Sequence, residues 1–231
     1  MPEHLKALLV PIHRAGWPFI GIALVLSLLL GFVAQPLLWL GLLVTGWVAY
    51  FFRDPPRVTP EGDELVVSPA DGTIVAIAPR VPPPELELGD APRTCISIFL
   101  NIFNVHVNRA SVSGRVARLV HRPGKFLNAA LDKASEENER QSLRIETPQG
   151  EAYGLVLIAG LVARRIVSFI EPAQRVRAGD RIALIRFGSR CDVYLPDGIT
   201  PLVVTGQRTF AGETVLADGR RNQPMRTGRR S

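Results

Sequence analysis

Residues 181–189 read Arg-Ile-Ala-Leu-Ile-Arg-Phe-Gly-Ser, an apolar run that ends in a glycine and a serine. Isoleucine and leucine in such a run favour a buried strand, and the glycine marks the point where the strand stops. Similar short runs, separated by Gly, Pro, Asp and Asn, recur at residues 65–68, 73–77, 95–100, 105–107, 114–120, 142–146 and 154–158. This spacing predicts a mainly β domain, an antiparallel sandwich or barrel.

Gly188 and Ser189 at the end of this strand indicate a self-cleavage site. Because glycine has no Cβ and tolerates a strained backbone, the Ser189 hydroxyl can approach the Gly188 carbonyl carbon. Attack would turn the amide into an ester, and elimination followed by hydrolysis would leave a pyruvoyl group on the new N-terminus. Gly-Ser is also common in ordinary turns, so this interpretation depends on the rest of the chain.

The chain carries no Asp, Glu, Lys or Arg over residues 15–52. A Gln-Pro pair divides this stretch into two apolar runs, 17–34 and 37–52, each near the lower limit of about 17 residues for a membrane-spanning helix. Basic residues flank both outer ends, which predicts that both ends are cytoplasmic. We expect a membrane anchor of two short helices over residues 1–58 and a catalytic domain over 59–231 on the cytoplasmic face of the cell membrane. A buried helical hairpin is the alternative.

The net charge of +6 could indicate nucleic acid, but much of it lies in a C-terminal tail with five arginines, Arg220, Arg221, Arg226, Arg229 and Arg230. Next to a membrane anchor, anionic lipid is the better partner. No nucleic-acid-binding signature is present, so no nucleic acid is expected.

Cys95 and Cys191 are expected to be core residues rather than a redox pair, and no metal site is expected. Residues 79–92 are predicted to form a proline-rich surface loop, and 125–140 a polar loop with one helical turn at most.

Three side chains at predicted strand ends could supply a nucleophile, a base and an acid. They are Ser189, His106 within Phe103-Asn-Val-His-Val-Asn108, and Asp71 within Ser68-Pro-Ala-Asp-Gly72. On an alternating strand His106 faces opposite to its valine neighbours. The alternatives are a hydrogen-bonded structural histidine and an Asp-Gly hairpin turn. Sequence spacing does not show whether the three side chains meet.

Six blocks of the chain, spread over nearly its whole length, resemble one enzyme family. They are Ser68-Pro-Ala-Asp-Gly72, Phe103-Asn-Val-His-Val-Asn-Arg109, Pro123-Gly-Lys-Phe-Leu-Asn-Ala129, Glu137-Asn-Glu-Arg140, Ile158-Ala-Gly-Leu-Val-Ala-Arg-Arg-Ile-Val167, and Arg186-Phe-Gly-Ser-Arg190 followed by Asp192-Val-Tyr-Leu-Pro196. In these blocks the chain resembles the phosphatidylserine decarboxylase proenzymes, in their short bacterial and archaeal-type branch.

The resemblance implies that Asp71, His106 and Ser189 form the self-cleavage triad, with Asp71 orienting His106 and His106 accepting the Ser189 proton. The break between Gly188 and Ser189 would give a β chain of residues 1–188 and an α chain of residues 189–231 that begins with the covalent pyruvoyl cofactor. The implied reaction converts phosphatidylserine to phosphatidylethanolamine and CO2 in phospholipid biosynthesis. The implied partners are phosphatidylserine, the lipid bilayer and the two chains as a heterodimer, with room for a higher oligomer.

The chain departs from the longer family members at two places. They carry Leu-Gly-Ser-Thr at the cleavage site, where this chain has Phe187-Gly-Ser-Arg190, and a second histidine where this chain has Phe103. The roles of that threonine and that histidine therefore do not transfer, and His106 is expected to be free after cleavage to protonate the substrate carbon.

Two other functions stay open at the level of sequence. Ser189 could be the lasting nucleophile of a membrane-anchored serine hydrolase, although the G-x-S-x-G elbow is missing. Residues 68–75 and 176–183 resemble the hammerhead strands of lipoyl and biotinyl domains, which would make a non-catalytic binding module. Neither of these segments contains the lysine that such carriers need.

Overall fold

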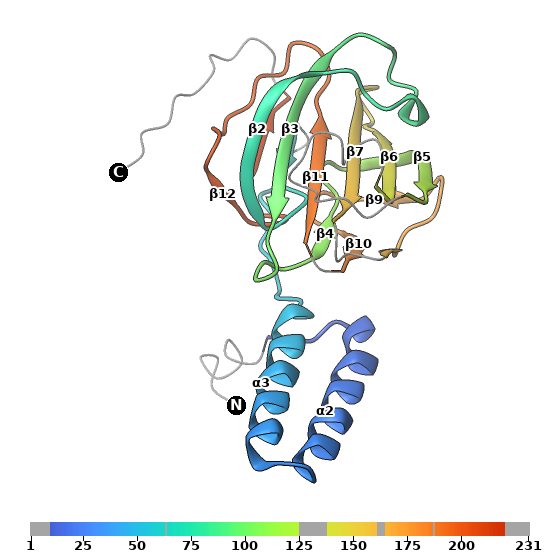
Figure 1. Ribbon diagram of the computed structural model, residues 1–231. Helices are drawn as coiled ribbons and strands as arrows, with labels where there is room; N and C mark the ends of the chain where they lie inside the picture. Colours follow the sequence, from blue (N-terminus) through green and yellow to red (C-terminus); the bar gives the residue numbers. More distant parts are fainter. Residues whose placement is uncertain (1–9, 63, 125–137, 161–164, 187, 220–231) are drawn as a thin grey trace. The chain divides into compact units, whose positions relative to one another are not determined.

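The computed structural model describes residues 10–62, 64–124, 138–160, 165–186 and 188–219. The chain divides into two compact units, Met1–Pro56 and Arg57–Ser231 (Figure 1). The predicted boundary at residue 58 and the predicted cleaved chains stay predictions. The arginine tail and most of the predicted 125–140 loop lie outside the described residues.

The first unit is a pair of apolar helices. A 3-10 helix η1 (Arg14–Gly16) leads into α2 (Trp17–Gly31), and α3 (Gln35–Phe51) follows after a short turn. A proline stands in the first turn of each α-helix, where its missing N–H costs no hydrogen bond. The segment Arg14–Gly31 is long and apolar enough to cross a membrane, whereas α3 is slightly shorter. The two hydroxyls of Ser27 and Thr45 lie 3.2 Å apart and join the helices.

The second unit is mainly β with antiparallel strands, so the predicted fold class is confirmed. A curled eight-stranded sheet has the order β12-β2-β3-β11-β7-β6-β5-β9, a three-stranded sheet the order β4-β10-β8, and β1 pairs with β13 (Figure 1). The strands are β1 (Leu65–Val67), β2 (Gly72–Arg80), β3 (Arg93–Leu100), β4 (Val107–Arg109), β5 (Gly114–Arg122), β6 (Arg140–Glu146), β7 (Ala152–Ala159), β8 (Ile166–Ser168), β9 (Arg175–Val176), β10 (Arg181–Ile185), β11 (Ser189–Tyr194), β12 (Arg208–Thr209) and β13 (Val215–Asp218).

The eight-stranded sheet is covered on both faces. One face carries the main core, which includes Ile98, Leu157, Cys191 and Val193. On the other face, Leu86 and Leu88 pack on a second cluster made by Cys95, Val156, Ile158 and Tyr194. Burial of both faces explains why the central strand β11 is buried along its whole length.

Three sequence expectations need correction. The proline-rich stretch 79–92 is not simply a surface loop, because β2 runs through Arg80 and η2 (Pro84–Leu86) buries Glu85 and Leu86 over the sheet. The strand expected from residue 142 begins already at Arg140. His106 lies before β4 rather than inside a strand, and it is fully buried together with its valine neighbours, so strand alternation does not describe this segment.

Candidate active site

Ser189 is the first residue of β11, in the middle of the eight-stranded sheet. It pairs with Leu100 of β3 on one side and with Ala159 of β7 on the other. Alternation along the strand places its side chain on the same face as Cys191, which packs in the main core. The Ser189 Oγ is buried and has no hydrogen-bond partner among the described residues. Most buried hydroxyls are paired, so this one is a candidate reactive group.

Gly188 holds the bond before Ser189 in an unusual setting. Its φ of 71° lies in the left-handed region that glycine adopts at little cost. Its N–H donates to His106 Nε2 at 3.2 Å, and its carbonyl oxygen accepts a hydrogen bond from the Gly160 N–H at 2.9 Å. The N–H of Gly188 therefore contacts a histidine nitrogen, and its carbonyl oxygen contacts a backbone donor.

The two nitrogens of the His106 ring have different neighbours. Nδ1 lies 3.0 Å from the carbonyl oxygen of Asn104, which can only accept, so we assign the ring proton to Nδ1. Nε2 is then the acceptor that faces Gly188. The carbonyl oxygen of His106 accepts from the Ile185 N–H at 3.1 Å, which ties this segment to the end of β10. The structure thus brings His106 to Gly188, the residue before Ser189.

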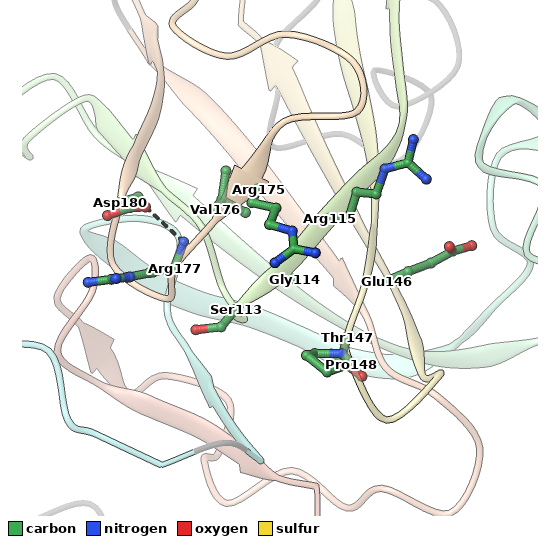
Figure 2. Close-up of a pocket in the computed structure, with 10 residues that line it drawn as sticks. All are labelled: Ser113, Gly114, Arg115, Glu146, Thr147, Pro148, Arg175, Val176, Arg177 and Asp180. Atoms are coloured by element: carbon green, nitrogen blue, oxygen red, sulfur yellow. Dashed lines mark hydrogen bonds between the residues drawn. The ribbon is translucent and has the colours of Figure 1, made fainter.

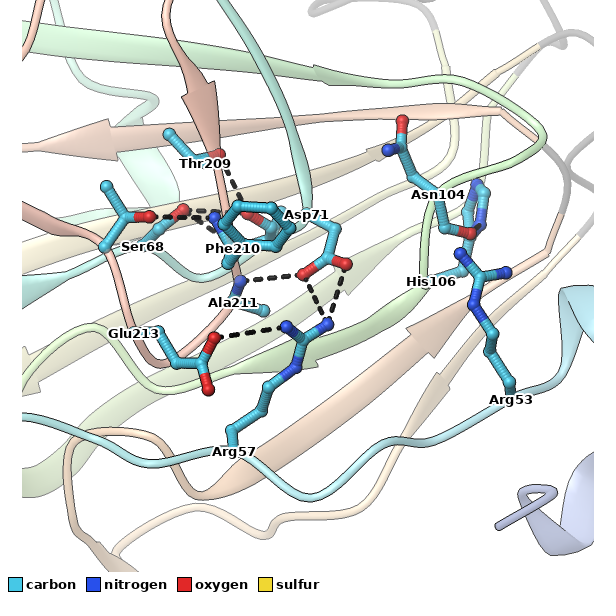
Figure 3. A network of polar contacts seen from close by, with 12 residues as sticks. Arg53, Arg57, Ser68, Asp71, Asn104, His106, Thr209, Phe210, Ala211 and Glu213 are labelled. Atoms are coloured by element: carbon cyan, nitrogen blue, oxygen red, sulfur yellow. Dashed lines mark hydrogen bonds and ion pairs between the residues drawn. The ribbon is translucent and has the colours of Figure 1, made fainter. Parts of the chain in front are cut away.

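Asp71 is buried and held by a separate polar network (Figure 3). Its carboxylate accepts from Arg57 Nη2 at 2.8 and 3.0 Å and from the Ala211 N–H at 2.8 Å. The same guanidinium donates to Glu213 at 3.3 Å. These bonds go to the start of the domain and to the β12–β13 connection rather than to the imidazole.

Asp71 and the segment before His106 nevertheless share a cavity. Both Asp71 and Asn104 line this space of about 240 Å3, together with Phe103 and Arg208. Phe103, which stands where longer family members carry a second histidine, is 57% exposed. The cavity therefore places the Asp71 carboxylate next to the chain that positions the His106 ring.

Sequence reasoning missed Gly160 and Arg57. Gly160 lies inside the block at residues 158–167, but only the fold shows that its N–H reaches the Gly188 carbonyl. The neighbouring strand end is held by Asn138, whose amide donates to the Ala159 carbonyl at 2.7 Å. The sequence presents Arg57 only as one of the basic residues that follow the apolar stretch, and no local pattern predicts its contact with Asp71.

The two cysteines are free thiols buried in the sheet, as expected for core residues. Burial and the nearby Asp192 charge raise the pKa of Cys95 to about 12, and burial and the same charge raise the pKa of Cys191 well above its ordinary value. Both are therefore poor nucleophiles. Within the described part of the chain, no three His, Cys, Asp or Glu side chains gather into a set that could hold a metal ion.

A larger pocket of about 690 Å3 lies at the other end of the sheet (Figure 2). Glu146 on its wall pairs with Ala152, at the opposite end of β7 from Ala159, which pairs with Ser189. Arg115, Arg175 and Arg177 also line it. This pocket is separate from the Ser189 site.

Comparisons with known proteins indicate the family of this chain. The sequence profile of the family described as phosphatidylserine decarboxylase matches residues 44–217. A phosphatidylserine decarboxylase proenzyme of Paramagnetospirillum magneticum is 56% identical over 213 residues, which cover 92% of this chain and 89% of the relative. A protein of the same description from Nitrobacter winogradskyi is 56% identical over 214 residues, covering 93% of this chain and 87% of the relative.

Proposed function

Because the chain belongs to the phosphatidylserine decarboxylase family, we propose that Ser189, His106 and Asp71 carry out its chemistry around the Gly188–Ser189 bond. The reaction is the decarboxylation of phosphatidylserine to phosphatidylethanolamine and CO2, a carboxy-lyase reaction of phospholipid biosynthesis. The observation that carries the assignment of residues is the buried Ser189 Oγ, which has no partner in the described part of the chain, next to a glycine whose N–H donates to His106 Nε2.

The relatives are described as proenzymes, and the first proposed step is self-cleavage. The Ser189 Oγ attacks the Gly188 carbonyl carbon, the C–N bond between the two residues breaks, and an ester replaces the amide. His106 Nε2 carries a lone pair. The ring releases the Gly188 N–H, accepts the proton of the Ser189 hydroxyl and passes it to the Ser189 nitrogen, which becomes an amine as the C–N bond breaks. Catalytic hydrogen bonds of this kind often tighten only as the reaction proceeds. Gly188 has no Cβ that could hinder the approach to its carbonyl carbon, and glycine adopts the left-handed backbone at little cost.

Gly160 supports this step through its backbone. As the Gly188 carbonyl is attacked, negative charge develops on its oxygen, which already accepts the Gly160 N–H at 2.9 Å. A fixed donor at this distance stabilises such a charge, and one donor of this type typically contributes about 10²–10³ in rate. Gly160 is therefore proposed as an oxyanion-stabilising residue.

Asp71 is proposed to act on His106 through the field of its carboxylate. Hydrogen bonds from Arg57 and from the Ala211 N–H hold the carboxylate in place. A fixed negative charge stabilises the imidazolium that forms when His106 accepts the proton. The Asn104 carbonyl, rather than Asp71, orients the ring in the described state.

The cofactor implied by the family is a covalent pyruvoyl group made from Ser189, and the residues present fit it. Ser189 is buried, lies at a strand end and follows a glycine, so cleavage leaves it at a new N-terminus inside the protein. Once formed, the group supplies a ketone that takes up the substrate amine and accepts electrons as CO2 departs. The surrounding core excludes water from this point, and His106 is placed to deliver the proton that replaces the carboxylate.

The membrane is the proposed location of the reaction. Phosphatidylserine is a bilayer lipid, and Arg14–Gly31 is long and apolar enough to cross a bilayer. We infer that the helical pair anchors the enzyme in the cell membrane with the β domain on the cytoplasmic face, and that the α and β chains stay together after cleavage. Strand β11 supports this association, because it begins at Ser189 and is paired on both sides with strands from before the break.

Intact mass measurement of the purified protein tests the proposal together with CO2 release from phosphatidylserine. The expected result is an α fragment of residues 189–231 whose N-terminus resists Edman degradation, because a ketone replaces the amine. A single unbroken chain with full activity would refute the assignment of Ser189. An unbroken chain that hydrolyses esters would instead favour the serine hydrolase alternative.

A further inference from the structure

Two arginines face each other across a strand pair close to Ser189. Strands β8 and β10 are antiparallel, with Ile166 opposite Ile185. The next pair along this register is Arg165 opposite Arg186, and the Arg186 N–H indeed donates to the Arg165 carbonyl at 3.4 Å. Side chains directly opposite in an antiparallel pair lie on the same face, with Cβ atoms about 4.5–5.5 Å apart.

An anion bound between the two guanidinium groups would relieve their mutual repulsion. Like charges directly opposite on two strands repel each other. Burial and the charge of Arg165 both lower the pKa of Arg186, in keeping with the facing positions of the two residues. No hydrogen bond or ion pair to another described residue engages the Arg165 guanidinium, which is exposed and lines a cavity of about 450 Å3.

The acidic side chain on the wall of the same cavity is already engaged. Glu139 Oε1 accepts the Ile166 N–H at 3.0 Å and lies 3.7 Å from His121 Nε2. Arg186, in turn, stands three residues before Ser189 in the chain. Arg165 therefore lines a cavity with room for a ligand, and Arg186, opposite it across the strand pair, links this place to the Ser189 segment.

We propose that Arg165 and Arg186 bind the phosphodiester group of phosphatidylserine and thereby position its headgroup at Ser189. This assignment rests on the decarboxylase function proposed above. Arginine suits the role because its planar fork matches phosphate oxygens with two parallel hydrogen bonds.

The reaction itself explains why the ligand is the phosphodiester rather than the carboxylate. The carboxylate loses its charge as CO2 leaves, so a clamp on it would stabilise the substrate more than the transition state and slow the reaction. The phosphodiester keeps its charge from substrate to product. A clamp on this group strengthens binding without opposing the chemical step.

Kinetics with soluble lipids test the proposal in the full-length enzyme. Dihexanoyl-phosphatidylserine in neutral detergent is the substrate, which removes the influence of a charged bilayer. In Arg165→Gln and Arg186→Gln, KM should rise about 10- to 100-fold, as expected for a lost charge-assisted hydrogen bond, with kcat nearly unchanged. Arg175→Gln is the matched control, because it removes one exposed arginine at the other end of the sheet, and its KM should stay at the wild-type value.

Product inhibition separates the two anionic groups of the substrate. Dihexanoyl-phosphatidylethanolamine keeps the phosphodiester and lacks the carboxylate, so its inhibition constant should rise by the same factor as KM. An unchanged inhibition constant with a raised KM would assign the arginines to the carboxylate and overturn the proposal, as would an unchanged KM in both variants.

The extent of self-cleavage is measured in the same samples. The α fragment should form normally in Arg165→Gln, which lies outside the cleavage segment, and this variant decides the matter if Arg186→Gln fails to split. Failure of the decarboxylase assignment itself would show differently, as a wild-type enzyme that neither splits nor releases CO2.

Discussion

The two ring nitrogens of His106 have different neighbours. Nδ1 faces the carbonyl oxygen of Asn104, and Nε2 accepts the N–H of Gly188, the residue before the bond that is cleaved. This difference makes Nε2 the basic atom of the site. In His106→Ala the Ser189 hydroxyl has no base, and processing should slow by about 10²–10⁴-fold. The measurement is the mass spectrum of the purified protein over time, and an α fragment that forms at the wild-type rate would remove His106 from the mechanism.

The described hydrogen bonds of the Asp71 carboxylate go to Arg57 and Ala211, so we expect its replacement to slow processing in a different way from the replacement of His106. Asp71→Asn keeps the shape and removes the charge, and the loss of processing rate in comparable triads is on the order of 10⁴-fold. We expect a smaller loss here, because the Asn104 carbonyl already orients the His106 ring.

Glu213→Gln is the control for Asp71→Asn, since Glu213 meets the same Arg57 from a more exposed position. Exposed ion pairs contribute little. Both variants are followed by the rate at which the α fragment appears. Equal rates in the two variants would show that the Asp71 charge has no special part in cleavage.

Gly160 can be tested by removing only its backbone donor. Gly160→Pro lacks the N–H that meets the Gly188 carbonyl, and processing should slow by about 10²–10³-fold. Gly160→Ala keeps the N–H and should process faster than the proline variant. Thermal unfolding of both unprocessed variants reports whether the fold is intact. Equal processing in two folded variants would contradict the oxyanion role.

At the scale of elements, η2 is joined to β6 by a buried ion pair. Glu85 Oε1 accepts from Arg140 Nε at 2.7 Å and from Ser142 Oγ at 3.1 Å. Burial alone would raise the pKa of Glu85, but the hydrogen bonds and the Arg140 charge bring it below its ordinary value of 4.5. A carboxylate with a lowered folded pKa stabilises the protein above pH 4.5, and this contribution is lost as the pH falls through the folded pKa.

Glu85→Gln should therefore destabilise the domain at pH 7, by about 3–5 kcal/mol, because it removes the carboxylate that faces the buried Arg140. The difference from the wild type should shrink below pH 4.5. Glu87→Gln is the matched control, since Glu87 lies two residues away and pairs with Arg118 at an exposed site. Denaturant unfolding at several pH values measures both, and a pH-independent difference would show that the Glu85 charge is not the cause.

At the scale of the whole molecule, charge should matter at the lipid surface. The tail from Arg220 to Arg230 carries five arginines, each of which adds about 1 kcal/mol near an anionic bilayer. Truncation after Gly219 should leave cleavage intact and raise KM on mixed vesicles, mainly at low salt, because salt screens the attraction. Full-length and truncated enzymes with the same KM across a salt series would show that the tail has no such role.

The local pattern of the sequence was enough to predict the mainly β class, the apolar helical pair, the two buried cysteines and the family. Strands and apolar helices follow from neighbouring residues, and family blocks are themselves local. The same reasoning missed the short strands β8, β9, β12 and β13. These strands are two to four residues long, and their pairing depends on distant partners rather than on their own composition.

The site depended on both levels. The sequence by itself determined which residues could react, because a serine after a glycine, a histidine and an aspartate are chemically recognisable wherever they lie. Only the tertiary structure decided that His106 reaches Gly188, that Gly160 meets the carbonyl, that Arg57 holds Asp71 and that Arg165 faces Arg186. The contacts of His106, Gly160 and Arg57 join residues far apart in the chain, and the facing of the two arginines depends on strand register. The chemistry of single residues sets neither the long-range contacts nor the facing of the arginines. Both result from how the strands pair and which faces of the sheets are buried.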